Sequence, residues 1–226
     1  RFTPVSFTGG TFRDRAGKPL LQPLYDWGLS VAFRDMNGDL APDLYVCNDF
    51  ESDDRIWIND GKGTFHPIEQ LALRRTSMFS MGIDFGDVNR DGFDDFLVLD
   101  MVSRDYSKRH VLVSGVPPTF LVPGQIDDRP QYSQNMLFLG RGDGTFAEAS
   151  QFSGVHASEW SWTPMFLDVD LDGYEDLLIT TGHEMDMMNV DVSNRAEEMK
   201  AQRELSKMEL LHLRKIQKKN EAQIER

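Results

Sequence analysis

Three segments of the chain repeat one pattern: a short apolar run, a nine-residue polar loop rich in aspartate, and a second apolar run. They read VAFRDMNGDLAPDLYVCND from Val31, IDFGDVNRDGFDDFLVLDM from Ile83 and MFLDVDLDGYEDLLITTGH from Met165. Short apolar runs bounded by turn-forming residues predict β-strands, so each segment predicts a strand, a loop and a strand. The first two loops begin 52 residues apart, at Asp35 and Asp87, which suits a repeat unit of about four strands.

A second repeated element follows each of the first two loops. It reads RIWINDGKGTFHPI from Arg55 and NMLFLGRGDGTFAEA from Asn135. Asp-Gly or Gly-Asp-Gly at the centre, followed by Thr-Phe, predicts a β-hairpin in both places. A partial copy, VSFTGGTFRDR, starts at Val5. The order of these elements predicts the end of one unit, two whole units and the start of a fourth, all built from β-strands.

Two segments depart from the repeat. The second unit carries an insertion at 102–134 that is rich in proline and charge and lacks clear periodicity, which predicts a long loop. Residues 194–226 contain no glycine or proline and many Glu, Lys, Arg and Leu residues, which predicts an amphipathic helix capped by Ser193 or Asn194. Nine basic residues exceed six acidic ones in this helix, which favours its docking on the acidic remainder of the chain.

Oxygen-bearing side chains recur at positions one, three, five and nine of all three loops. Two carboxylates about 4 Å apart repel by roughly 1 kcal/mol in water and about 4 kcal/mol near a protein surface, so converging aspartates need a counter-charge. Calcium meets that need because it gathers about six to eight oxygen ligands. The sequence therefore predicts up to three Ca2+ sites, each with a backbone carbonyl from position seven. The candidate ligands are Asp35, Asn37, Asp39, Ala41 and Asp43; Asp87, Asn89, Asp91, Phe93 and Asp95; and Asp168, Asp170, Asp172, Tyr174 and Asp176.

The spacing of these ligands differs from that of an EF-hand. An EF-hand loop needs a glutamate at position twelve, and here that position is an aliphatic residue within a strand-like run. Gly92 and Gly173 at position six permit a backbone reversal, whereas the first loop has Leu40 there and Gly38 two residues earlier. The alternative, an ordinary solvated acidic turn, would suit one copy, but three copies in one register favour a metal site. The third loop has four carboxylates rather than three and an asparagine, so we expect the tightest binding there.

The loop pattern, the apolar strand after it and the NDGKGTF and GRGDGTF hairpins together resemble the FG-GAP or VCBS repeats of integrin-alpha-like β-propellers. WSWTPMFLDVDLDGYEDL from Trp160 and FSMGIDFGDVNRDGFDDFLVLDM from Phe79 are similar to exported bacterial proteins of the ASPIC/UnbV and cartilage-acidic-protein type. The resemblance implies that residues 1–193 form an all-β, partial β-propeller of about three to four blades, followed by the C-terminal α-helix. Propellers have about four to eight blades, so we expect an incomplete ring, as in a fragment or the ordered part of a longer protein.

Composition disfavours several classes of function. A formal net charge of -13 would repel a phosphate backbone, so no nucleic acid partner is expected. No apolar stretch approaches the about 20 residues that a membrane span needs. A single cysteine, Cys47, excludes an internal disulfide framework and a thiolate zinc site. The sequence also lacks the motifs of serine hydrolases, zinc proteases and phosphate-binding loops, which argues against an enzyme.

These observations favour a calcium-stabilised propeller segment of an exported protein, in an extracellular, periplasmic or cell-surface location. We expect it to serve as a protein-binding, adhesion or assembly scaffold, with a protein partner or the remaining blades of its parent as its contacts. The alternative is an accessory carbohydrate-binding domain of a larger exported enzyme, with a glycan as ligand. Trp27, Trp160 and Trp162 precede strands at equivalent places; their positions favour packing between blades over a platform for sugars.

Overall fold

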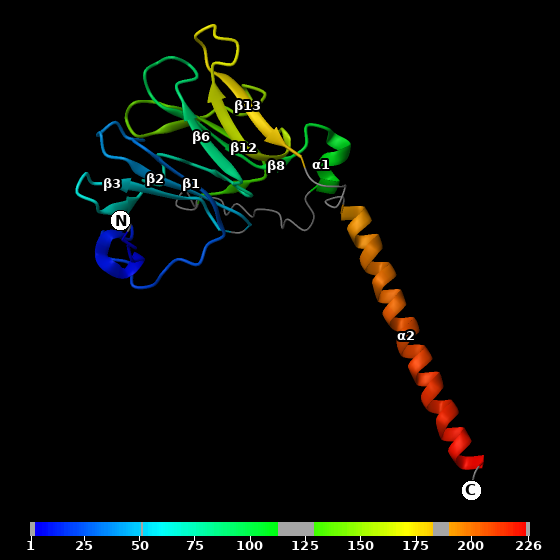
Figure 1. The fold of residues 1–226 in the computed structure, drawn as a ribbon. Coiled ribbons are helices and arrows are strands. Elements are labelled where there is room, and N and C mark those ends of the chain that lie inside the picture. The colour runs from blue at the N-terminus through cyan, green and yellow to red at the C-terminus, as the bar shows by residue number, and fades with distance from the viewer. Residues whose placement is uncertain (1–2, 51, 113–128, 183–189, 225–226) are drawn as a thin grey trace.

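Three antiparallel β-sheets stand beside one another, and a long helix extends away from them (Figure 1). The computed structural model describes residues 3–50, 52–112, 129–182 and 190–224. The first sheet has the order β1-β2-β3-β4, with β1 at Gly28–Arg34, β2 at Asp43–Asn48, β3 at Arg55–Asn59 and β4 at Phe65–Pro67. The second has the order β6-β7-β10-β11, with β6 at Gly82–Gly86, β7 at Asp95–Leu99, β10 at Met136–Gly140 and β11 at Phe146–Glu148. The third joins β8 at Met101–Val102, β12 at Glu159–Leu167 and β13 at Asp176–Thr181.

The predicted strand–loop–strand units are confirmed. The three acidic loops join β1 to β2, β6 to β7 and β12 to β13, and each pair of strands is antiparallel. The two predicted hairpins are β3–β4 and β10–β11. In the first two sheets the hairpin pairs directly with the second strand of the unit, β3 with β2 and β10 with β7. Each whole repeat unit is therefore one four-stranded sheet.

The strand β7 lies at the centre of the packing, and all five of its residues are buried. Successive side chains of a strand point to opposite faces of its sheet. Phe96 and Val98 accordingly pack into a cluster with Tyr45 of the first sheet. Leu97 and Leu99 pack on the other side, in a cluster that includes residues of the third sheet. A strand covered on both faces needs a continuous apolar run, which the sequence FLVL supplies.

The first strands of the three units, β1, β6 and β12, are neighbours, with β6 in contact with both of the others. Close approach of β6 and β12 depends on glycine, because a Cβ at Gly82 would lie 2.4 Å from the backbone oxygen of Trp162. Within the described residues, no outer hairpin follows β13, so the third unit has only its inner strands. The sheets are blades that do not close a ring, which confirms the predicted all-β, partial-propeller fold.

Two predicted details are wrong. The partial hairpin copy near Val5 is a helical turn, η1 at Phe7–Thr11, and the Phe12 that follows it bridges in parallel to Phe65 of β4. The chain reverses later than predicted, after Phe12, where Arg13 bridges Pro19 in antiparallel fashion and the Leu20 N–H donates to the Phe12 carbonyl. The insertion is not wholly loop: it contains α1 at Tyr106–Leu112 and β9 at Gln131–Tyr132, which pairs in parallel with β5 at Thr76–Ser77. Its central part, 113–128, lies outside the described residues.

The C-terminal helix α2 spans Val190–Ile224, so it begins before the predicted caps Ser193 and Asn194. The expected docking of this helix on the acidic sheets is also wrong, because α2 extends away from them (Figure 1). Met208 and Leu211 on it are exposed. Among the described helices, none combines the length and the apolar character that crossing a membrane requires.

Candidate metal-binding loops

The carboxylate at position one of each loop accepts hydrogen bonds from backbone N–H groups of the same loop. Asp35 accepts from the amides of Gly38, Asp39 and Leu40 at 2.8 to 3.1 Å. The equivalent carboxylates Asp87 and Asp168 accept from the amides at positions five and six of their own loops. Each loop therefore wraps around its first aspartate, and the N–H dipoles offset part of the repulsion among its carboxylates.

The carboxylate at position nine anchors the loop to the sheet. One oxygen of Asp43, Asp95 and Asp176 accepts the N–H of position two, at 2.8, 3.0 and 3.0 Å. In the first two loops the second oxygen accepts an N–H from the hairpin, from Asn59 to Asp43 and from Gly140 to Asp95. Both of these carboxylates are fully buried, and burial raises their pKa although the donated N–H groups lower it in part. Asp176 is exposed, since no hairpin covers it within the described residues.

All three loops share a backbone shape with two left-handed residues, at positions four and six. The φ angles are 78° at Gly38 and 68° at Leu40 in the first loop. In the second and third loops a non-glycine residue has φ near 60° at position four, and glycine has φ above 80° at position six. Glycine thus occupies one of the two left-handed positions in every loop, but not the same one. The first loop is therefore regular in shape, despite its leucine at position six.

The third loop brings three carboxylates together. Asp168, Asp170 and Asp176 each place one carboxylate oxygen so that the three oxygens lie within 4.8 Å of one another. Asp172, the fourth predicted carboxylate, is not part of this group and accepts the N–H of Tyr174 at 2.8 Å. Three anionic oxygens at such spacing fit a hard cation, because they can move onto a common ion with small side-chain rotations.

In the first two loops asparagine changes the arrangement at position three. The Asn37 amide donates to the Asp39 carboxylate at 3.0 Å, and the Asn89 amide donates to Asp91 at 2.9 Å. The position-seven residues Ala41 and Phe93 also donate their N–H groups to these carboxylates. The asparagine N–H groups therefore offset part of the negative charge of these carboxylates, which would otherwise attract a cation. The third loop has no such internal donor at position three, because Asp170 replaces the amide with a second anion.

The comparison with protein families agrees with this geometry. A model described as an FG-GAP-like repeat matches residues 35–98 and 122–179, which together make up more than half of the chain. The chain belongs to the FG-GAP-like repeat family. Both matched stretches end within a strand that follows an acidic loop, β7 and β13. FG-GAP domains are typically non-catalytic and generally mediate protein interactions. A search of curated proteins found no match to this chain.

Neighbouring FG-GAP loops are linked by two arginines that the sequence analysis did not identify. Arg34, at the end of β1, pairs with Asp94 of the second loop through two bonds of 2.5 and 2.6 Å. Arg90 of the second loop donates to the carbonyl of Gly173 in the third loop, and its guanidinium lies 3.8 Å from the centre of the Tyr174 ring. The sequence feature that could have identified them is the presence of a basic residue, Arg34 or Arg90, within a strongly acidic segment. The three FG-GAP loops therefore form one connected edge of the molecule.

Two further buried carboxylates lie at the junctions between FG-GAP sheets. Asp54 accepts bonds from the Tyr45 hydroxyl, the Asn48 N–H and the Ser80 hydroxyl, at 2.7, 2.8 and 2.8 Å. Burial raises its pKa to about 7, and burial raises the pKa of Asp100 to about 6. Neither group lies in an acidic loop, so the spacing of the loop aspartates does not point to them.

Proposed function

We propose that the FG-GAP loops bind up to three calcium ions that stabilise the propeller sheets. The observation that carries this proposal is the convergence of Asp168, Asp170 and Asp176, in a loop whose shape recurs in the other two. Ligands from positions one, three, five and nine would surround the ion, and the position-seven carbonyl would complete the protein's share. Calcium would supply positive charge between carboxylates that otherwise repel, and so fix the entry into each second strand.

We further propose that the chain is part of an exported protein, related to the ASPIC/UnbV and cartilage-acidic-protein type. The sequence WSWTPMFLDVDLDGYEDL supports this relationship. Outside the cell calcium is abundant, so loops with dissociation constants of about 0.1 to 1 mM would remain occupied there. Recovery of the mature protein from the cytoplasm, rather than from the medium, periplasm or cell surface, would contradict export.

Within that setting the chain would serve as a protein-binding scaffold in adhesion or assembly. The elements that a four-stranded blade does not need, α1 and α2, are the best candidates for partner contacts. The exposed Met199, Met208 and Leu211 on α2 supply apolar surface for such a contact. Co-purification of a stable protein partner that is lost when residues 194–226 are deleted would support this role. Unchanged partner binding after the deletion would place the contact elsewhere.

Calcium binding is tested by calorimetric titration of the metal-free protein. Asp170→Asn converts the third loop to the pattern of the other two, so we expect the tightest site to weaken by about tenfold or more, because one ligand charge is lost. The matched control is Asp143→Asn, which changes an exposed aspartate of the β10–β11 turn. An affinity that is equal in wild type and Asp170→Asn would refute the ranking, and no calcium uptake at all would refute the proposal.

A carbohydrate-binding role is the second candidate, favoured by exposed aromatic rings. Trp27 is 64% exposed and Trp162 is 43% exposed, so neither ring is fully used in packing between blades. Exposed aromatic faces can stack on sugars. A glycan-array signal that Trp162→Ala abolishes would favour this role, and the chain would then be an accessory domain of a larger exported enzyme.

A further inference from the structure

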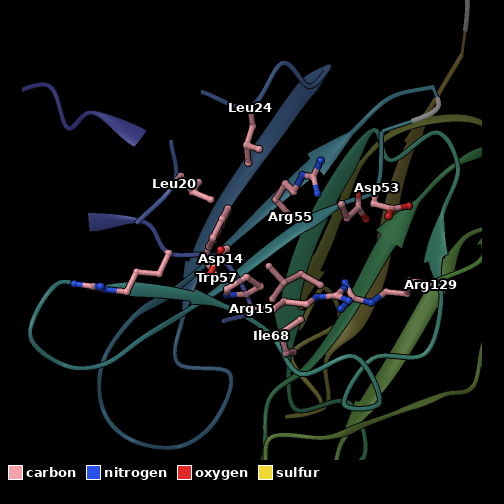
Figure 2. A pocket seen from close by; sticks show the side chains of 13 residues that line it. Asp14, Arg15, Leu20, Leu24, Asp53, Arg55, Trp57, Ile68 and Arg129 are labelled. Atoms are coloured by element: carbon pink, nitrogen blue, oxygen red, sulfur yellow. The ribbon is translucent and has the colours of Figure 1, made fainter. Parts of the chain in front are cut away.

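A cavity of about 280 Å³ lies between the N-terminal segment, the β3–β4 hairpin and Arg129, far along the chain. Figure 2 shows its walls: Leu20 and Leu24 come from the N-terminal segment, Trp57 lies on β3, and Ile68 directly follows β4. An apolar cavity of about 150 Å³ is enough to hold benzene, so this volume suits a small organic molecule. The cavity shares no residue with the three acidic loops.

Positive side chains gather at this cavity in a strongly acidic protein. Four arginines line it together with three aspartates. Two of the arginines are already engaged: Arg55 forms a two-bond ion pair with Asp26, at 2.9 and 3.0 Å, and Arg13 donates to the Gly17 carbonyl at 3.0 Å. The bond to a neutral carbonyl leaves the charge of Arg13 in place, and the guanidiniums of Arg15 and Arg129 remain as donors for a ligand.

The Arg129 guanidinium is incompletely satisfied. Its Nε is buried and has no hydrogen-bond partner among the described residues. Burial lowers the pKa of Arg129, and the like charge of Arg15 lowers it further, while Tyr45, Asp53 and Asp54 act in the opposite direction. A buried donor without an acceptor is costly and is normally matched by a water, an ion or a ligand. An anionic oxygen bound in the cavity would satisfy this donor.

We propose that this cavity binds a small monocarboxylate with an apolar body. The carboxylate would accept from the Arg15 and Arg129 guanidiniums, whose planar N–H groups suit its two oxygens. The apolar body would lie against Trp57 and Ile68. This inference is independent of calcium binding by the FG-GAP loops.

The local charge favours one negative charge over two or three. With Arg55 neutralised by Asp26, three arginines face three aspartates. Asp54 has its pKa raised to about 7, so it is partly protonated near neutral pH and leaves a small positive excess. A singly charged carboxylate matches that excess. Phosphate, with more charge and no apolar part, matches neither the excess nor the walls.

Titration calorimetry with phenylacetate in 0.15 M NaCl tests the proposal. We expect saturable binding, and binding of the neutral analogue phenylacetamide weaker by about tenfold or more, because it cannot form charge-assisted bonds. Inorganic phosphate should bind more weakly than phenylacetate. Equal binding of the amide would show that the charge is unused, and tighter binding of phosphate would overturn the carboxylate class.

Variants locate the site. Arg129→Gln should weaken phenylacetate binding by about tenfold or more, because it removes one of the charge-assisted donors. Arg15→Gln should also weaken it, and Arg15 is exposed, so this variant is expected to fold even if Arg129→Gln does not. The matched control is Arg141→Gln in the β10–β11 turn, outside the cavity. Unchanged affinity in Arg15→Gln and in folded Arg129→Gln, or equal loss in the control, would overturn the proposal.

Discussion

At one position of the sheet junctions, the first sheet has an acid where the second sheet has an amide. Asp54 and Asn135 each directly precede the third strand of their sheet, β3 and β10. In the first sheet the Asn48 N–H donates to Asp54, and in the second the Asp100 N–H donates to Asn135, both at 2.8 Å. The acceptor is thus a carboxylate in one blade and an amide oxygen in the other. The same backbone N–H bond is therefore present in both sheets. The buried carboxylate belongs to the acceptor residue, Asp54, in the first sheet and to the donor residue, Asp100, in the second.

This exchange leads to a prediction for pH. The pKa values of Asp54 and Asp100 are raised to about 7 and about 6, above the ordinary value of 3.8. The folded state then binds more protons than the unfolded state between about pH 4 and 7, so stability is highest below that range and falls as pH rises through it. Asp54→Asn copies Asn135 and should flatten the upper part of this fall. In wild type we expect the free energy of unfolding to fall by on the order of 2 to 4 kcal/mol over that upper part.

Urea denaturation from pH 5 to 8 measures the difference. Asp60→Asn is the control, because Asp60 is exposed and backbone hydrogen bonds from Thr64 and Lys62 lower its pKa. Its titration lies below the range measured, so the control curve should run parallel to that of wild type. A curve for Asp54→Asn that is also parallel to wild type would show that Asp54 carries its charge at no cost.

At the scale of elements, β7 and β13 occupy equivalent places in their units but have different surroundings. Leu97 of β7 is fully buried between the second and third sheets. Leu178 of β13 points to the opposite side from Leu177 and Ile179, and it is 49% exposed. The strand β13 is covered on one face only, whereas β7 is covered on both.

Truncation of each leucine should reveal this difference. Leu97→Ala should lower the free energy of unfolding by about 2 to 5 kcal/mol, because it leaves a cavity in a core that is packed from both sides. Leu178→Ala should cost less than about 1 kcal/mol, since half of its side chain is already in water. Urea denaturation of the two variants measures both values. Equal costs would mean that β13 is covered in solution by something outside the described residues.

The local patterns predicted the elements well where one residue type was needed at a fixed spacing. The apolar run around Leu97 predicted a strand, and the Asp-Gly turns predicted both hairpins. The shared shape of the loops was missed, because glycine marks only one of the two left-handed positions and Leu40, Arg90 and Leu171 occupy the others. A non-glycine residue there costs roughly 1 to 2 kcal/mol, a cost that the local pattern of residue types does not reveal.

The contacts between units could not be predicted from the sequence. The Arg34–Asp94 pair joins residues 60 apart, and the Arg90–Gly173 bond joins residues 83 apart. Only the stacking of blades brings them together. The helix α1 was missed for a related reason, since seven residues within an insertion are too few to show a period.

At the scale of the whole molecule, negative charge is concentrated along the edge where the three loops meet. The formal net charge is -13, and three bound calcium ions would bring it to -7. Because Arg34 and Arg90 hold adjacent loops in contact, repulsion within one loop also affects its neighbour. Metal-free loops should therefore respond to ionic screening more strongly than metal-bound ones.

Chelation and salt together test this picture. At calcium concentrations about 100-fold above the dissociation constant, one site adds about 2.7 kcal/mol, or about 5 to 10 °C in melting temperature for a chain of this size. EGTA should remove that gain, and 0.5 M NaCl should restore part of it only in the chelated protein, because mobile ions screen carboxylates that have lost their cation. Thermal denaturation followed by circular dichroism measures all four conditions. If EGTA leaves the melting temperature unchanged, backbone N–H groups alone hold the loops; if salt acts equally with and without EGTA, repulsion among the loop carboxylates is not what calcium relieves.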